Sequence, residues 1–164
     1  MNFSHYAKSI TYGGLDGIIT TFAVVAGAIG GNLGTAAIII LGFSNLLADG
    51  FSMAAGDYLS STTEEGTDSS KALNNAVMTF LSFNFFGLIP LLSYLLLIHL
   101  SDFSDRVTLI LASLLVSLAL VALGWIKATI TKQSKRTEIV RTLIVGIVAA
   151  AVAFLIGQVL GSFI

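Results

Sequence analysis

The sequence predicts an all-α integral membrane protein, and three observations support this fold class. First, 55% of the 164 residues are hydrophobic and only 10% are charged, whereas about a quarter of the residues in a soluble domain are charged. Second, the apolar residues form five runs, each about as long as the 20 residues with which a helix crosses a bilayer. Third, the alternating strands of a membrane β-barrel, about ten residues each, are absent. The length fits a single transmembrane domain over residues 1–164.

The five expected transmembrane helices cover about residues 10–30, 35–59, 76–98, 107–126 and 139–163. A glycine-rich turn, GAIGGNLG, joins the first two, and a polar connection over residues 60–75 follows the second. The third contains Pro90, the only proline, which kinks a helix because it removes a backbone hydrogen bond. Such a break either marks a moving element of a transporter or is a static kink.

The positive charges predict the orientation of the chain in the membrane. With five spans, the N-terminus, the 60–75 connection and a basic loop over 127–138 share one side. That side carries seven of the eight Lys and Arg residues, namely Lys8, Lys71, Lys127, Lys132, Lys135, Arg136 and Arg141, and the other side carries Arg106. Because basic residues favour the cytosolic side, we expect a cytosolic N-terminus and a C-terminus outside the cell or in a lumen.

Small residues spaced four apart predict close contacts between helices, because small side chains let two backbones approach each other in lipid. The pairs are Gly13 and Gly17, Gly27 and Gly31, Ser52 and Gly56, and Gly157 and Gly161. An odd number of spans excludes a simple inverted duplication within one chain. Any two-fold symmetry would therefore come from a dimer.

The second expected helix carries Asn45, Asp49, Met53 and Asp57 at successive steps of four residues, which keeps them on one helix face. We call these four residues the polar stripe. An ionised Asp in the middle of a bilayer costs roughly 2.5–3.5 kcal/mol on insertion scales, and a bound divalent cation would offset this cost. Carboxylate oxygen with thioether sulfur suits a first-row ion such as Fe²⁺ better than Mg²⁺ or Ca²⁺, which prefer oxygen ligands alone.

Each of these residues also has a structural interpretation. Met53 alone is a flexible core residue, and Asp57 is a carboxylate solvated at the membrane interface. Asn45 either ligates weakly or hydrogen-bonds across helices. Asp16, in the segment GGLDGIITTFAVVAG, is either a metal ligand or a cap of the first helix. We predict Asp16, Met53, Asp49, Asp57 and Asn45 as the metal site.

Other patterns exclude several classes of function. The chain has no Cys, so thiolate ligands and disulfides are excluded. No nucleophile–base pair or phosphate-binding loop appears, which argues against an enzyme and against a permanently bound cofactor. The basic residues are too few for a nucleic-acid partner. Glu64, Glu65 and Asp68 form an acidic patch in the 60–75 connection, which either attracts cations or is simply solvated.

The segments GGLDGIITTFAVVAGAIGG and ADGFSMAAGDYLSS together resemble the vacuolar iron transporter family, which includes yeast vacuolar and plant nodulin-like iron and manganese carriers. The resemblance continues through FLSFNFFGLIPLLSYLL, ALGWIKA and RTLIVGIVAAAVAFLIG. It implies a homodimer whose first helices line a path between protomers. It further implies export of Fe²⁺ or Mn²⁺ from the cytosol in exchange for protons, with Asp16 and Met53 as ligands.

The sequence departs from the family pattern in two places. The connection SSTTEEGTDSSKALNN is short, as in the nodulin-like branch, and lacks the cytosolic metal-binding helices of many members. Asn45 also stands where some members have a Glu eight residues before the Met, and the carboxylate here is Asp49.

Several alternatives stay open. The transported ion is Fe²⁺ or Mn²⁺, or else Co²⁺ or Zn²⁺. The membrane is a bacterial inner membrane, or a vacuolar-type membrane if the host is eukaryotic. Two other functions are compatible with the sequence. One is a non-transporting membrane protein that assists assembly or responds to metal, and the other is a less selective cation or proton channel.

Overall fold

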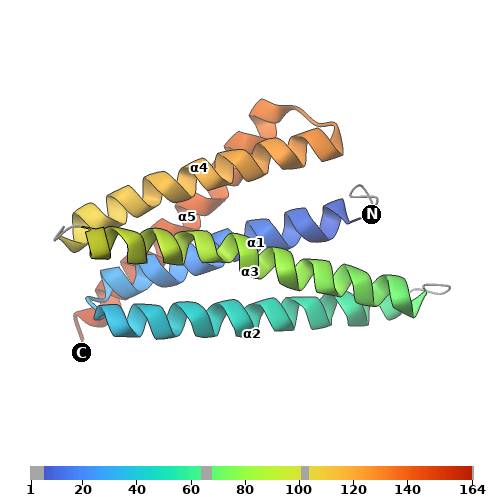
Figure 1. Cartoon of the computed structure of the whole chain (residues 1–164). Coiled ribbons are helices and arrows are strands. Elements are labelled where there is room, and N and C mark those ends of the chain that lie inside the picture. Colours follow the sequence, from blue (N-terminus) through green and yellow to red (C-terminus); the bar gives the residue numbers. More distant parts are fainter. Residues whose placement is uncertain (1–5, 64–67, 101–103, 164) are drawn as a thin grey trace.

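A computed structural model describes residues 6–63, 68–100 and 104–163. Within these ranges the chain forms five long α-helices, and each is long and apolar enough to cross a membrane (Figure 1). They are α1 (Ala7–Gly30), α2 (Thr35–Thr62), α3 (Ser69–Leu100), α4 (Asp105–Thr131) and α5 (Lys135–Gly161). The predicted all-α architecture with five such helices is confirmed.

The helices extend beyond the apolar runs mainly at one end of the bundle. Here α2 continues to Thr62, α3 begins at Ser69 and α4 continues to Thr131. The expected loop over 127–138 is therefore wrong, since only residues 132–134 connect α4 to α5. Hydropathy marks the part of a helix that suits hydrocarbon, but a helix satisfies its own backbone hydrogen bonds and can continue into water.

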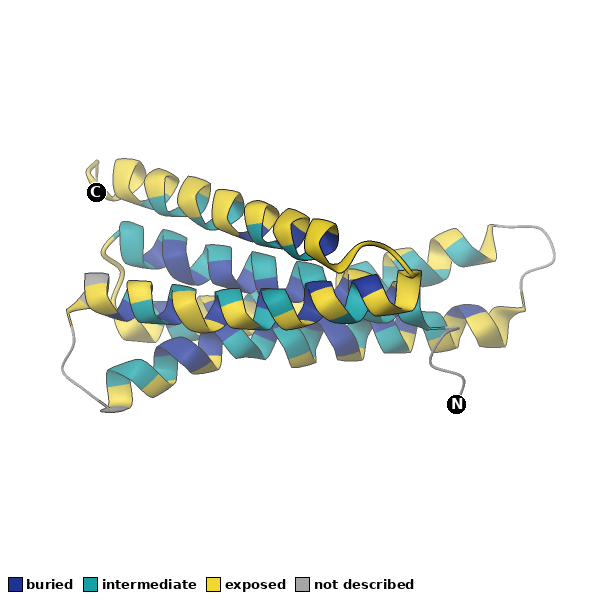
Figure 2. Ribbon diagram, turned by 90° about the horizontal axis from the view of Figure 1, so that it is seen from above, coloured by how far each residue is buried: buried dark blue, intermediate teal, exposed yellow. Residues whose placement is uncertain are grey.

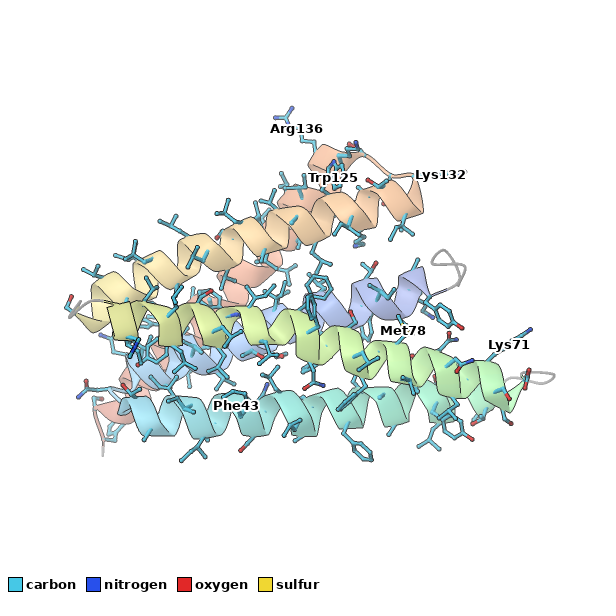
Figure 3. All side chains as sticks on the ribbon, viewed as in Figure 1. Phe43, Lys71, Met78, Trp125, Lys132 and Arg136 are labelled. Carbon is cyan, nitrogen blue, oxygen red and sulfur yellow. The ribbon has the colours of Figure 1, made fainter. Side chains whose placement is uncertain are left out.

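The two ends of the bundle contain different parts of the chain. The start of α1, the end of α2, the start of α3 and the α4–α5 connection lie at one end, and the C-terminus lies at the other (Figure 1). Lys71, Lys132 and Arg136 all lie at the first end (Figure 3), which we call the basic end. The basic end is the one that the charge distribution predicts to be cytosolic.

Helix α1 is the centre of the bundle. It contacts each of the other four helices, most extensively α3 and α5, whereas the described parts of α2 and α5 flank it without packing against each other. Figure 2 shows buried residues concentrated on the inner helices and exposed residues along α5. Large outward-facing side chains such as Phe51 and Phe85, each 69% exposed, are those expected of helices that face lipid.

Glycine spacing explains how α1 approaches α3. A Cβ atom on Gly13 would lie 2.7 Å from the carbonyl oxygen of Thr79, and a Cβ on Gly17 would overlap the backbone of Phe83. A larger residue at either position would push the two helices apart. The predicted close contact of the Gly13–Gly17 pair is therefore present, and its partner is the backbone of α3.

The remaining small-residue pairs divide into two groups. Gly27 of α1 and its C-cap residue Gly31 pack against Gly157 and Gly161 of α5, so that a Cβ on Gly161 would lie 2.8 Å from the carbonyl oxygen of Gly31. By contrast, a Cβ on Gly56 would meet no atom within 4 Å, and Ser52 is exposed. One chain therefore leaves the small surface of α2 uncovered.

Pro90 does not interrupt α3, which continues from Ser69 to Leu100 with Pro90 in its interior. Proline has no N–H, so the carbonyl of Phe86 receives no hydrogen bond from residue 90. The side of α3 that carries Pro90 is buried.

Candidate metal site

The polar stripe of α2 lies along two concave surfaces beside α1. Asn45, Met53 and Asp57 are half-buried and Asp49 is exposed, but all four line one of two cavities beside α1. The predicted common face is therefore present. It divides into a pair near the basic end, Met53 and Asp57, and a pair further along the helix, Asn45 and Asp49.

The first cavity, which we call the Asp57 cavity, has a volume of about 450 Å³ and lies between α1, α2 and α3. Its lining residues are Lys8, Ser9, Tyr12, Met53, Gly56, Asp57, Ser60 and Thr79. The Asp57 Oδ2 atom accepts a hydrogen bond of 2.6 Å from the Thr79 hydroxyl and one of 3.4 Å from the Ser9 hydroxyl. Asp57 is therefore held by protein donors from two other helices, in addition to any solvation at the interface.

Met53 lies at the boundary between the apolar core and the Asp57 cavity. It packs against the apolar cluster that contains Val25, Leu46 and Phe83, and it also lines the Asp57 cavity. A thioether in this position fills part of the core while it borders a cavity that holds a carboxylate.

The second cavity, which we call the α2–α5 groove, has a volume of about 680 Å³. Its base is the α1 segment that contains Ala23 and Gly27, and its walls carry Asn45 and Asp49 from α2 and apolar residues from α5. The Asn45 Nδ2 atom is buried without a hydrogen-bond partner. The groove thus offers a carboxylate and an unused amide donor on a mainly apolar surface between two helices.

Asp16 lies within α1, which begins at Ala7 with Tyr6 at its N-cap, so it does not cap the helix. It is half-buried, and the Thr20 hydroxyl donates to its backbone carbonyl at 2.8 Å. The negative charges of Asp16 and Asp49 lie near enough to repel each other. The described residues that line the two cavities do not include Asp16.

Acidic and imidazole side chains of the described residues do not gather into a metal site within one chain. Among the residues that the structure describes, no three His, Cys, Asp or Glu side chains come close enough to hold an ion together. Of the acidic patch, Glu64 and Glu65 lie outside the described residues. The Asp68 Oδ1 atom accepts a hydrogen bond of 3.0 Å from the Ser70 backbone N–H at the start of α3, which is a capping contact.

Sequence reasoning missed two features. Thr79 and Ser9 contact Asp57 from other helices. The only sequence signals were a hydroxyl residue inside the third apolar run for Thr79 and one directly before the first run for Ser9. The second feature is Glu138, which is 1% exposed. It pairs with Lys127 Nζ at 2.6 Å and with Arg141 at 3.1 Å. An acid in the first turn of a helix is favoured by the helix dipole. The sequence signal for Glu138 was a single acid among basic residues.

A family model described as the VIT family matches residues 7–71 and 63–158, which together cover most of the chain. The chain belongs to the VIT family. Members of this family are transporters rather than enzymes, in agreement with the prediction from the sequence.

Three relatives illustrate this VIT family membership. The vacuolar iron transporter of Plasmodium berghei is 27% identical over 94% of this chain and 82% of its own length. Vacuolar iron transporter homolog 4 of Arabidopsis thaliana is 26% identical over 97% of this chain and 86% of its own length. A vacuolar iron transporter of Toxoplasma gondii is 47% identical over 62 residues, which cover 38% of this chain but only 20% of that relative.

Proposed function

We propose that this VIT family member exports Fe²⁺ or Mn²⁺ from the cytosol in exchange for protons. The single observation that carries the proposal is the position of the polar stripe. Its side chains border cavities beside α1, and Asp49 lies near enough to Asp16 for their charges to repel. The names of the relatives, vacuolar iron transporters, favour iron among the candidate ions.

The charge balance explains why metal and proton movements are coupled. Two carboxylates that repel each other inside a membrane are unfavourable, because little water is present to screen them. A divalent cation removes the repulsion when the site is loaded, and protons remove it when the site is empty. Each loading step therefore releases protons, and each unloading step takes them up.

The residues of the proposed site have different roles. Asp16 and Met53 are ligands, and Asp49 is a ligand or the proton acceptor. Asp57 is the carboxylate of the Asp57 cavity, at the basic end through which a cytosolic ion would enter. Asn45 supplies an amide group beside Asp49 in the α2–α5 groove. A site with both carboxylate and thioether ligands suits Fe²⁺, Mn²⁺, Co²⁺ or Zn²⁺.

A homodimer would supply the ligands that one chain lacks. The α2–α5 groove leaves part of α1 uncovered, and α2 presents a row of small exposed residues beside it. This row contains Ser44, Ala48, Ser52, Gly56 and Ser60. Small residues at steps of four let a second helix approach closely. A second copy that packs on this surface would double the number of carboxylates and thioethers near α1.

The short connection between α2 and α3 means that this protein would capture cytosolic metal differently from its longer relatives. The two family matches overlap at residues 63–71. The alignment to the Plasmodium berghei relative runs over 226 positions, although it covers 94% of a chain of 164 residues. The alignment to the Arabidopsis relative needs only 175 positions. These comparisons support a member without cytosolic metal-binding helices.

The test is metal uptake by sealed vesicles that contain the purified protein and a pH-sensitive dye. We expect Fe²⁺ or Mn²⁺ uptake with proton movement in the opposite direction, and reduction to background by Asp16→Asn or Met53→Ala. Asp68→Asn and Met78→Ala are matched controls, because Asp68 is an exposed acid at the start of α3 and Met78 lines neither cavity.

Three results would contradict the proposal. If Asp16→Asn and Met53→Ala transport as well as the parent, the assignment of ligands is wrong. If the parent protein shows no flux while these variants change dimerisation or stability, the protein has a non-transporting role. If ions cross without proton exchange, the protein is a channel.

A further inference from the structure

A third cavity lies between the first turns of α1 and the last turns of α4, at the basic end. It has a volume of about 470 Å³, and its lining combines two lysines, three hydroxyl residues and three apolar residues. These are Lys8, Lys127, Thr11, Tyr12, Thr131, Ala7, Leu15 and Ile130. We call it the Lys127 cavity. Nothing in the proposed transport path uses this side of α4.

The lining of the cavity contains two basic residues, Lys8 and Lys127, and no acidic one. Glu138, which is almost fully buried, pairs with both Lys127 and Arg141, so two cations share one anion. An ammonium group has three hydrogen-bond donors, so Lys127 can approach a second anion while it keeps its ion pair of 2.6 Å with Glu138. The Lys127 side chain is 32% exposed. Lys8 adds a second positive charge, and it lines both this cavity and the Asp57 cavity.

Glu138 fixes the position of Lys127. A free lysine at a membrane boundary extends its amine toward water. Here the buried carboxylate on α5 holds the amine of Lys127 against the bundle, where it lines the cavity. The structure therefore presents one oriented ammonium group from α4 and one from α1 around the same space.

The depth of the cavity in the membrane points to a lipid. Trp125 precedes Lys127 by two residues near the end of α4, and the Lys135 amine lies 5.1 Å from the centre of the Trp125 ring. Figure 3 shows Trp125 near the basic end of α4. Because Trp residues concentrate at the headgroup level of a bilayer, the two lysines of the cavity lie at the level of lipid phosphates. Leu15 and Ile130 supply apolar lining.

We propose that the Lys127 cavity binds the phosphate headgroup of an anionic phospholipid of the phosphatidylglycerol class. Lys8 and Lys127 contact the phosphate, the hydroxyl groups of the lining bind its polar remainder, and Leu15 and Ile130 contact the start of an acyl chain. Basic pockets between transmembrane helices favour anionic headgroups for this reason. The inference requires that the helices span a bilayer, but it does not depend on metal transport.

The experiment measures lipid binding to the purified full-length protein in detergent by native mass spectrometry. Phosphatidylglycerol is compared with phosphatidylcholine of the same acyl chains, and inorganic phosphate is added as a competitor. We expect preferential binding of phosphatidylglycerol, reduced about fivefold by Lys8→Gln. Lys71→Gln is the matched control, because Lys71 is exposed at the same end but does not line the cavity.

A second variant tests the other lysine. Lys127→Gln alone leaves buried Glu138 with one partner fewer, so the double variant Lys127→Gln/Glu138→Gln removes both charges together. We expect it to lose phosphatidylglycerol binding as Lys8→Gln does. Equal losses in Lys8→Gln and Lys71→Gln would overturn the proposal, since they indicate general surface attraction. Equal binding of the two lipids would overturn it too, and so would displacement of the lipid by inorganic phosphate, which indicates a site for a soluble anion.

Discussion

Glu138 and the pair of Asp16 and Asp49 are acids on the same bundle with opposite surroundings. Glu138 is almost fully buried, and its own chain neutralises it twice, through Lys127 and Arg141. Neither Asp16 nor Asp49 forms an ion pair within the described part of the chain. Their negative charges repel each other. An acid that is neutralised within the chain stabilises the fold, whereas acids left unneutralised need a partner from outside it.

The two regions also differ in how completely they are packed. At the α1–α5 contact, Gly27 and Gly31 meet Gly157 and Gly161 so closely that no side chain fits between the helices. On α2, Gly56 meets no neighbour within 4 Å. The same spacing of small residues therefore closes one helix pair and leaves the other surface open for a second copy.

The largest expected effect comes from Asp16→Asn. It removes one of two mutually repelling charges, so we expect loss of metal uptake to background while the midpoint of thermal unfolding stays the same or rises. Uptake by sealed vesicles and a thermal unfolding curve of the same preparation check this. If Asp16→Asn still transports metal, or if it fails to fold, Asp16 has a structural role like that of Glu138.

Glu138→Gln is the converse change. It leaves Lys127 and Arg141 without their shared anion, so the contact between α4 and α5 weakens. We expect the midpoint of thermal unfolding to fall by several degrees, with uptake per folded molecule close to that of the parent. Asp68→Asn, at an exposed helix start, is the control. Loss of uptake without loss of stability would contradict the division between structural and functional acids.

Gly161→Ala and Gly56→Leu test the difference in packing. A Cβ on Gly161 would lie 2.8 Å from the Gly31 carbonyl oxygen, and such overpacking costs about 1–3 kcal/mol of stability. A Cβ on Gly56 would meet no atom within 4 Å, so we expect Gly56→Leu to give monomers that keep their helices, seen by light scattering and circular dichroism. Ala36→Leu, at another exposed position on α2, should stay dimeric. If Gly56→Leu remains a dimer, the small exposed residues of α2 around Gly56 are not part of the dimer interface.

The smallest expected effect comes from Thr79→Val. It removes the 2.6 Å hydrogen bond to Asp57, and a hydrogen bond to a charged group contributes about 1.5 kcal/mol or more. We expect about a tenfold rise in the metal concentration that gives half-maximal uptake, with the maximal rate little changed. Thr129→Val is the control, because the Thr129 hydroxyl bonds only within α4, to the Trp125 carbonyl. If the metal concentration for half-maximal uptake is unchanged in Thr79→Val, Asp57 is not part of the entry path.

Much of the fold was predictable because hydropathy and small-residue spacing are local signals. The five helices follow from apolar runs, and the close contacts at Gly13, Gly17, Gly27 and Gly31 follow from steps of four. The choice of partner helix was not predictable, because spacing on one helix does not identify the surface that it meets. The helix ends were misplaced because hydropathy does not report the polar turns that continue a helix into water.

The candidate site was predictable only in part, for the same reason. The polar stripe needed only the period of one helix, and the structure shows its residues along two cavities. The contacts of Thr79 and Ser9 with Asp57 depend on the packing of three helices. The role of Glu138 depends on the adjacency of α4 and α5, which turns an acid in an expected loop into a buried one.

The central claim is that Asp16 and Met53 hold the transported ion between two copies of the chain. An anomalous-scattering map of crystals soaked in Mn²⁺ tests it most directly. We predict a peak between the Asp16 carboxylates of the two protomers, with Met53 sulfur among its neighbours and no such peak in Asp16→Asn. Peaks confined to the exposed acids at the basic end, with none beside α1, would contradict the account.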